Sequence, residues 1–263
     1  MKCKRASTQL QDIPSGSDII IIATSDQAIA EVATGLATQK HLRFKKLFIA
    51  HTSGVYSSGV LKPLARKGAT VASLHPIQTF PSNQRLPQLR NKLRGIYFGI
   101  EGDAEGISLA ERIVKDLEGN SIVISKELKP LYHVICVFAS GYFMVFLNTI
   151  SELTRLLNIK ASWTEVFGPL MTTAMENTVR NSAANALTGP ILRADFSTVH
   201  LHLDALSQSA PQFLPLYTTA GIESARIAKN SGKITREDYN HLISQFKKFI
   251  RTATFKQPRK VTR

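Results

Sequence analysis

The chain has 263 residues, of which 43% are hydrophobic, and this composition is typical of a globular protein with one large domain or two modest ones. Lys and Arg outnumber Asp and Glu by 33 to 19, giving a formal net charge of +14, but most basic residues are scattered and only residues 255–263 form a run. We therefore do not expect nucleic-acid binding to be the main role. The two cysteines, Cys3 and Cys136, exclude a disulfide framework and a cysteine-based zinc site.

The sequence predicts neither a membrane span nor an export signal. Its most apolar stretch, residues 134–147, is interrupted by Ser140 and Gly141 and is shorter than the roughly 18 residues that a bilayer requires. We expect it to form a buried helix. The basic start, residues 1–5, is followed by polar residues instead of the apolar core of a signal peptide. These features indicate a cytoplasmic protein without a membrane partner.

The first half of the chain alternates short β-branched runs with helical patterns, which is the rhythm of βαβ units. The runs at residues 19 and 47 are almost continuously apolar, as expected for parallel strands that are covered on both faces. Residues 26–36 follow helical periodicity, with Ser25 or Asp26 as the N-cap. Residues 76–95 predict a long, functional loop. The five predicted strands are residues 19–23, 47–50, 70–74, 96–100 and 122–124.

After Pro130 the strand-like runs stop and amphipathic helical patterns follow one another. The sequence of residues 235–238 resembles a capping box at the start of the last helix. We therefore predict an α/β fold, with a Rossmann-like parallel sheet in residues 1–128 and an all-α domain in residues 129–263. The predicted helices are residues 131–157, 161–184, 196–208, 212–231 and 235–254.

Two polar clusters, residues 51–54 and 73–80, follow predicted strands, where an open α/β sheet binds its ligands. His51 and His75 are expected to face one crevice, where neutral imidazole suits proton transfer. Structural alternatives remain open, with His51 bound to a carbonyl in a turn and His75 bound to loop backbone. No neighbouring carboxylate completes a Ser-His-Asp set with Ser53, which disfavours hydrolysis. Gln78 would extend the polar wall.

Thr24, Ser25 and Asp26 follow the first predicted strand and open a helix, so they could line a cofactor crevice or form a plain N-cap. Near the middle of the helical half, Arg193 could clamp a substrate carboxylate. Alternatively, Arg193 and Asp195 could cap helices at a dimer contact. No metal site is expected, since His200 and His202 would point to different sides of a helix.

Three motifs together, residues 51–54 (His-Thr-Ser-Gly), 73–80 (Ser-Leu-His-Pro-Ile-Gln-Thr-Phe) and 187–195 (which begin Leu-Thr-Gly-Pro), carry a resemblance to a known family. The chain resembles an uncharacterised family of Rossmann-like proteins, similar to pyrroline-5-carboxylate reductase and the deazaflavin-dependent NADP oxidoreductases. More distantly, it is similar to prephenate and 3-hydroxyacid dehydrogenases. The likeness runs from about Asp18 to Phe249 and implies an NAD(P)-linked oxidoreductase.

The chain departs from that family at two places. The family begins with a strand, a Gly-x-Gly-x-x-Gly turn and a helix, and this sequence contains no such turn. The resemblance thus implies a truncated or misassigned start, which leaves the strand at Ile19 without a neighbour. The positive charge of residues 2–5 favours NADP over NAD. Gly141 stands where similar proteins often carry an Asn that faces the nicotinamide.

Our leading hypothesis is an NAD(P)-dependent oxidoreductase that acts on a small carbonyl, imine or carboxylate substrate and forms a homodimer through its helical half. The alternative is a cofactor-free binding or scaffold protein with the same dimeric half. A third possibility is nucleic-acid binding through the basic surface. In the leading hypothesis the catalytic residues are His75, His51 and Ser53, NADP is bound by Thr24, Ser25, Asp26 and Thr52, and substrate by Gln78, Thr188, Gly189 and Arg193.

Overall fold

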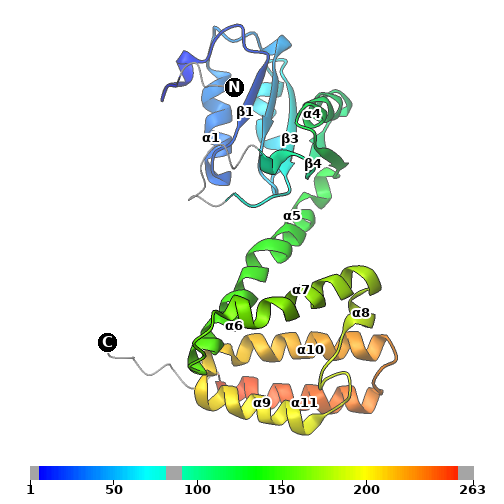
Figure 1. Ribbon diagram of the computed structural model, residues 1–263. Coiled ribbons are helices and arrows are strands. Elements are labelled where there is room, and N and C mark those ends of the chain that lie inside the picture. The colour runs from blue at the N-terminus through cyan, green and yellow to red at the C-terminus, as the bar shows by residue number, and fades with distance from the viewer. Residues whose placement is uncertain (1–5, 81–90, 254–263) are drawn as a thin grey trace. The chain divides into compact units, whose positions relative to one another are not determined.

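The structure is a computed structural model that describes residues 6–80 and 91–253, and it divides into two compact units, Met1–Met144 and Val145–Arg263 (Figure 1). The first unit holds the whole sheet, and the second is built from helices. The contacts place the helix that follows the sheet, α5 (Lys129–Val137), in the first unit. The domain boundary between residues 128 and 129 stays a prediction.

The first unit contains a five-stranded sheet in the order β1-β2-β3-β4-β5, so all five predicted strands are present. The predicted parallel sheet is confirmed for most of its pairs, β1 with β2, β2 with β3, and β4 with β5. It is wrong for β4, which runs antiparallel to β3. An antiparallel neighbour can be reached by a return loop without the crossover helix that a parallel one needs. The strands are β1 (Ile19–Ile22), β2 (Phe48–His51), β3 (Thr70–Pro76), β4 (Tyr97–Gly102) and β5 (Asn120–Val123).

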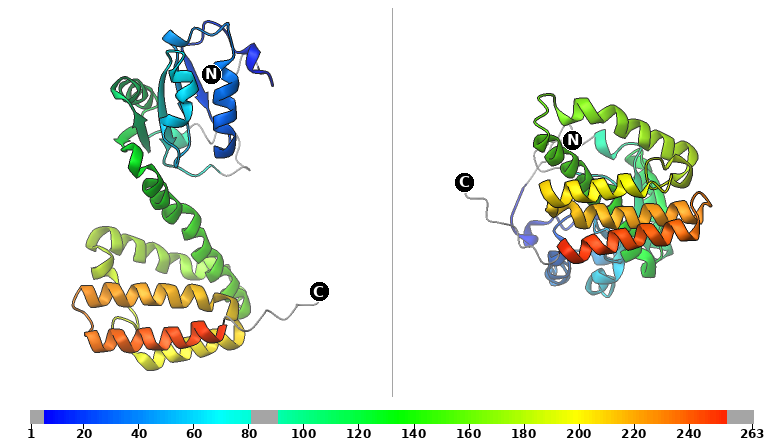
Figure 2. Two further views of the ribbon diagram at one scale, coloured as in Figure 1. Left: turned by 180° about the vertical axis from the view of Figure 1, so that it is seen from behind. Right: turned by 90° about the horizontal axis from the view of Figure 1, so that it is seen from below.

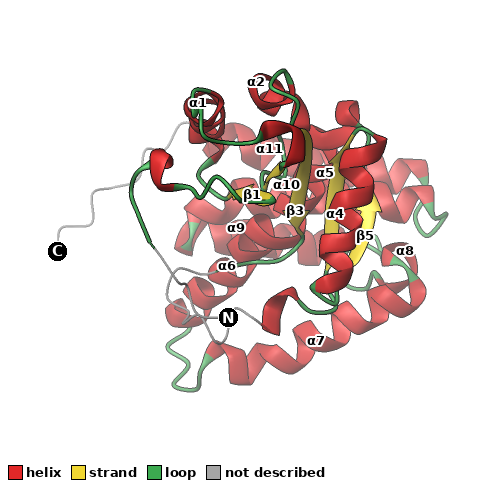
Figure 3. Cartoon of the chain, turned by 90° about the horizontal axis from the view of Figure 1, so that it is seen from above, coloured by secondary structure: helices red, strands yellow, loops and turns green. Residues whose placement is uncertain are grey.

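Helices cover both faces of this sheet. α1 (Asp26–Ala37) and α2 (Lys62–Ala65) lie on one side and α4 (Ala104–Asp116) packs on β3, β4 and β5 from the other (Figures 1 and 3). Alternate residues of β2 therefore enter two separate cores, Ile49 that of α1 and α2, and Phe48 that of α4. Because α4 does not extend over the edge strand β1, Ile19 and Ile21 on that face stay 51% and 42% exposed.

A continuous helical stretch follows the sheet, as the sequence predicts. It consists of α5, a π-helical turn (Phe138–Tyr142) and α6 (Phe143–Leu156). The expectation that it is buried is wrong, because none of its most apolar window is buried. Among the described residues it is also the one helix, Lys126–Leu156, that is long and apolar enough to cross a membrane, with a mean hydropathy of 1.8. This corrects the sequence argument from length, but one such helix is weak evidence of a span, since core helices have the same composition.

The second unit has its core between three helices that lie side by side, α9, α10 and α11 (Figure 2). Gly221 of α10 permits their close approach, because a Cβ there would lie 2.5 Å from Cζ of Phe246. The predicted capping box of the last helix is confirmed, since the Thr235 amide donates to Asp238 and the Asp238 amide donates to the Thr235 hydroxyl. The helices of this unit after α6 are α7 (Trp163–Asn181), α8 (Ala183–Ala186), α9 (Phe196–Ser209), α10 (Leu214–Asn230) and α11 (Arg236–Ala253).

Candidate functional site

His51, the last residue of β2, is fully buried and uses both ring nitrogens on backbone. Its Nε2 lies 3.1 Å from the Ser57 carbonyl oxygen, and its Nδ1 accepts from the Ser53 amide at 3.2 Å. The proton of the neutral ring therefore lies on Nε2. Burial lowers the pKa of His51, and the bond to Ser57 only partly offsets this effect. In this geometry His51 closes the turn that follows β2.

Ser53 is also tied to that turn. Its hydroxyl oxygen accepts from the amides of Val55 at 3.3 Å and Tyr56 at 3.1 Å. Its carbonyl oxygen accepts from the Ser73 hydroxyl on the next strand at 3.3 Å. With 5% of its surface exposed, Ser53 links the ends of β2 and β3 and offers little area to a ligand.

His75, near the end of β3, has a different environment. Its Nδ1 lies 2.6 Å from the hydroxyl of Tyr132 on α5. Burial, together with the charge of Lys129, lowers the pKa of His75 to about 4, whereas burial raises the pKa of the Tyr132 phenol. The phenol stays protonated, and in the tautomer that carries the imidazole proton on Nε2 its O–H donates a hydrogen bond to Nδ1. Nε2 has no hydrogen-bond partner within the described part of the chain.

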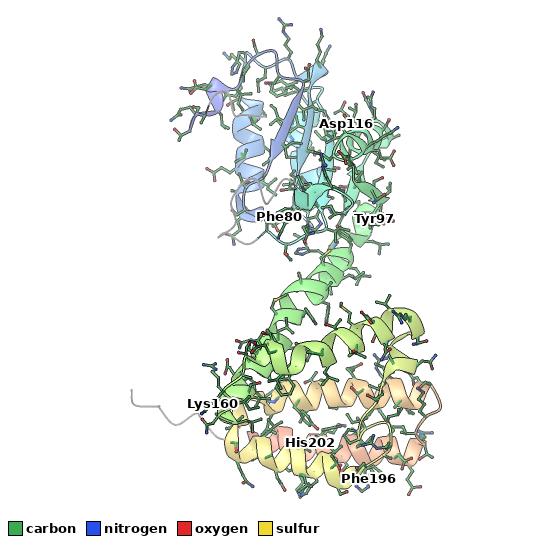
Figure 4. All side chains as sticks on the ribbon, viewed as in Figure 1. Phe80, Tyr97, Asp116, Lys160, Phe196 and His202 are labelled. Carbon is green, nitrogen blue, oxygen red and sulfur yellow. The ribbon has the colours of Figure 1, made fainter. Side chains whose placement is uncertain are left out.

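His75 lines a pocket of about 350 Å³ within the first unit, and its Nε2 lies close to Gly54, 3.0 Å from the position of a Cβ there. The pocket lies between the segment after β3 and the start of the long helix, including its π-helical turn. Figure 4 shows Phe80 and Tyr97 at this end of the sheet, and the Ile77 amide donates to the Tyr97 carbonyl at 2.9 Å. The pocket is lined by His75, Ile77, Gln78, Thr79, His133, Cys136, Val137, Ala139 and Ser140.

Two glycines make room for the aromatic rings of α5. A Cβ on Gly54 would lie 2.4 Å from Cδ2 of His133, and a Cβ on Gly99 would lie 2.4 Å from the hydroxyl oxygen of Tyr132. Both positions are buried, so neither contact could be relieved by a small shift into solvent. The close approach of α5 to the strand ends therefore depends on glycine at both positions.

Lys129 is the residue of the site that sequence reasoning missed. Its side chain is fully buried, and its Nζ donates to the Ser73 hydroxyl at 2.7 Å and the Ser53 carbonyl at 3.2 Å. Burial lowers its pKa to about 8, opposed by the charge of Glu101. The predicted helix over residues 131–157 begins after Lys129, so no role was predicted for this residue. A contact across 56 positions leaves no local pattern, although a Lys-Pro pair that opens an apolar helix could have been a signal.

The residues predicted to bind the cofactor lie at the ends of β1 and β2. Ser25 occupies the N-cap position of α1, but its exposed side chain makes no capping bond. The exposed Thr24 hydroxyl bonds only to the neighbouring Ser25 carbonyl, at 3.3 Å. The amide of Thr52 donates to the Ile22 carbonyl at 3.1 Å, which joins the two strand ends. The hydroxyl groups of Thr24 and Ser25 are thus accessible to a ligand.

The remaining predicted residues belong to the second unit. Thr188 and Arg193 are exposed, and Gly189 has a φ of +96°. Asp195 caps α9 by accepting from the Thr198 amide at 3.0 Å, and the bonds from Thr198 and Ser197 lower its pKa to about 2. No ion pair joins Arg193 to Asp195 in the described structure. The described residues also contain no cluster of three His, Cys, Asp or Glu side chains that could hold a metal ion.

The sheet and its helices define a Rossmann-type fold, and residues 4–76 match the family "Rossmann-like domain". Residues 96–223 match the family "Domain of unknown function (DUF2520)". The chain therefore combines a Rossmann-like domain with a DUF2520 domain, which confirms the resemblance to an uncharacterised Rossmann-like family. A search of curated proteins finds no match.

Two solved structures share this fold. Protein TM1727 from Thermotoga maritima is 25% identical, with a TM-score of 0.65 over 83% of this chain and 81% of its own. BF3122 from Bacteroides fragilis, described as a proposed NADP oxidoreductase, is 20% identical, with a TM-score of 0.68 over 84% of this chain and 80% of its own. At this identity the second likeness concerns the fold alone.

Proposed function

We propose that the chain is an NAD(P)-linked oxidoreductase that reduces a small carbonyl or imine, or oxidises the corresponding product. In this reaction the substrate would bind next to His75. The observation that carries the proposal is His75, whose ring is held by Tyr132, lines a pocket at the carboxyl end of β3, and has an Nε2 without a hydrogen-bond partner among the described residues. The Rossmann-like domain and the resemblance to NADP-linked families support it. A small carboxylate-bearing substrate remains part of the proposal.

In this proposal His75 acts as a neutral hydrogen-bond donor. With a pKa of about 4 the imidazole is uncharged near pH 7, so its Nε2–H can polarise a substrate oxygen or nitrogen. Tyr132 holds the ring by the 2.6 Å bond to Nδ1, which fixes the donor in one orientation. Gln78 extends the polar wall of the pocket. The proposal thus changes the role of His75 from proton donor to electrophile.

In this proposal His51 and Ser53 are positioning residues that shape the site through their hydrogen bonds. Their hydrogen-bonding groups are used within the turn after β2 and on β3, where they hold Gly54 against the rings of His133 and His75. Neither side chain is expected to touch substrate.

The residues at the ends of β1 and β2 fit the nicotinamide end of a dinucleotide. The hydroxyl groups of Thr24 and Ser25 are exposed, with Asp26 and Thr52 beside them. The nicotinamide group supplies or accepts a hydride when bound. The sequence contains no glycine-rich turn for the pyrophosphate. Residues 2–5, which favour NADP by their charge, lie outside the described residues.

The helical unit contains further residues predicted to bind substrate, and the predicted dimer contact. Thr188, Gly189 and Arg193 remain candidates to bind substrate, with the exposed guanidinium as a carboxylate clamp. No residue of α7 is buried in the single chain, and Leu170 and Val179 are 67% and 82% exposed. A second copy of the chain that packs on α7 would cover these exposed side chains.

Calorimetric titration with NADPH and NADH, followed by NADPH consumption over a panel of small ketones, 2-oxo acids and cyclic imines, tests the proposal. We expect NADPH to bind, and His75→Ala to keep that binding but lower turnover about 100-fold. The matched control is His202→Ala, because His202 makes a similar bond to a tyrosine, 2.8 Å from the Tyr217 hydroxyl, in the second unit. Unchanged turnover in His75→Ala would exclude the catalytic role.

The alternative, a cofactor-free binding or scaffold protein, is favoured by one observation, the lack of a Gly-x-Gly-x-x-Gly turn in the sequence. The same titration separates the two. If neither NADPH nor NADH binds to the folded chain, and light scattering shows a dimer, the oxidoreductase proposal fails and the scaffold remains.

A further inference from the structure

Lys129 is buried without a carboxylate partner. Its Nζ has two oxygen acceptors, both uncharged, and lies 5.4 Å from the centre of the Tyr132 ring. Glu101 is 5% exposed and binds the amide and hydroxyl of Ser58 instead. Within the described ranges no ion pair includes Lys129. A desolvated ammonium group without a direct ion pair is costly, so such a group is expected to serve a purpose beyond folding.

We infer that Lys129 is a positioning residue of the His75 site, a buried ammonium group that joins the ends of β2 and β3 and keeps the His75 imidazole uncharged. The inference rests on the proposed role of His75 for its functional meaning. The protonation state of the His75 imidazole, which the inference concerns directly, can be measured without cofactor or substrate.

The contacts form a continuous path from Lys129 to His75. Lys129 and Tyr132 are three residues apart on α5 and so lie on one face of the helix. The ammonium group approaches the Tyr132 ring, and the hydroxyl of that ring lies 2.6 Å from Nδ1 of His75. A proton on His75 would place a second positive charge one ring away from the first, in a largely buried region.

The other charged and titratable groups around His75 do not cancel this effect. His133 of α5 packs edge-on at 6.0 Å between ring centres, and its charge, like that of His51, would add to the repulsion. Asp26 of α1 acts in the opposite sense on His75. The groups that face Lys129 itself are Glu101 of β4, Cys136 of α5 and Asp26 of α1, all of which favour its charged form.

The two groups define a pH window for the site. The pKa of His75 is about 4 and that of Lys129 about 8, both lowered mainly by burial. Between these values the lysine is charged and the histidine is neutral. Above the upper value the ammonium loses its proton, and the repulsion that acts on His75 is removed.

Nuclear magnetic resonance of the histidine rings in the whole chain tests the inference. We expect wild-type His75 to stay in the neutral Nε2–H form until the pH falls toward about 4. In Lys129→Met the titration midpoint of His75 should rise by about one pH unit, because the neighbouring charge is gone. Lys126→Met is the control, since Lys126 is exposed three residues earlier, and it should leave the midpoint unchanged.

An unmoved midpoint in folded Lys129→Met would overturn the inference. If that variant does not fold, the pH dependence of the His75 resonances in the wild-type chain tests the inference instead. The His75 resonances should then shift with a midpoint near the Lys129 pKa of about 8, and their constancy across that range would equally overturn the inference. A shifted midpoint in a chain that binds no NADPH would refute the proposed function and leave this inference intact.

Discussion

His51 and His75 end neighbouring strands of one sheet, yet their surroundings give them different capacities. Both ring nitrogens of His51 form hydrogen bonds with backbone groups of its own turn. His75 uses one nitrogen in the bond with Tyr132, its other nitrogen has no partner among the described residues, and its ring lines a pocket. A histidine at a strand end is therefore a candidate for chemistry only where the fold leaves one of its nitrogens unused.

The largest test of this contrast is a pair of alanine substitutions. His51→Ala removes a fully buried ring and leaves the buried Ser53 amide without its partner, so we expect a loss of about 3 kcal/mol in the free energy of unfolding. His75→Ala should cost about 1 kcal/mol, because only one hydrogen bond is lost beside an existing pocket. Urea denaturation measures both, and equal losses would contradict the contrast.

The second test fills the space beside Gly99 that the Tyr132 ring needs in order to bind His75. Gly99→Ala forces a methyl group against the Tyr132 hydroxyl, so we expect it to cost about 2 kcal/mol and to break the bond between Tyr132 and His75. Gly141→Ala is the control, since nothing lies within 4 Å of a Cβ at that helical position. That change should stabilise the chain by about 0.5 kcal/mol. Thermal unfolding of the two variants should shift in opposite directions.

The third test uses pH. The pKa of His75 is about 4 in the folded chain, below its ordinary value of 6.5, so the unfolded chain binds more protons between these values. Stability should therefore fall as the pH drops through this range. The part due to His75 is about 1.5 kcal/mol after allowance for partial exposure, and His75→Gln should remove it. Identical pH profiles for wild type and variant would show that the folded pKa is not lowered.

The smallest effect is expected at the cofactor end of the sheet. Ser25 makes no capping bond, so Ser25→Ala should change the unfolding free energy by less than about 0.3 kcal/mol. Ser162→Ala, which removes an established capping box on α7, should cost about 1 kcal/mol. A weaker affinity of Ser25→Ala for NADPH, at unchanged stability, would support a ligand role for the hydroxyl group.

The elements of the fold could be predicted because their signals are local. Apolar runs identify the strands, and helical periodicity and capping residues place α9 and α11 within a few residues of their observed ends. The reversed direction of β4 could not be predicted, since it depends on the path of the connection between Pro76 and Tyr97.

The candidate site was predictable only in part. The strand-end position of His75 is visible in sequence, but its partner Tyr132 is 57 residues away. Lys129 has a polar identity that conflicts with burial, so no pattern of hydrophobicity places it in the interior. The exposure of residues 134–147 was missed for the opposite reason, because an apolar sequence does not say what covers it.

The edge strand β1 has a consequence for how the chain behaves in concentrated solution. It has a neighbour on one side only within the described residues, and it carries the exposed Ile19 and Ile21. A row of unpaired peptide groups beside apolar side chains is a template for strand addition. The net charge of +14 opposes such contacts between copies, and salt screens that repulsion. In dilute, low-salt solutions copies of the chain should therefore stay separate, and rising ionic strength should promote their assembly along β1.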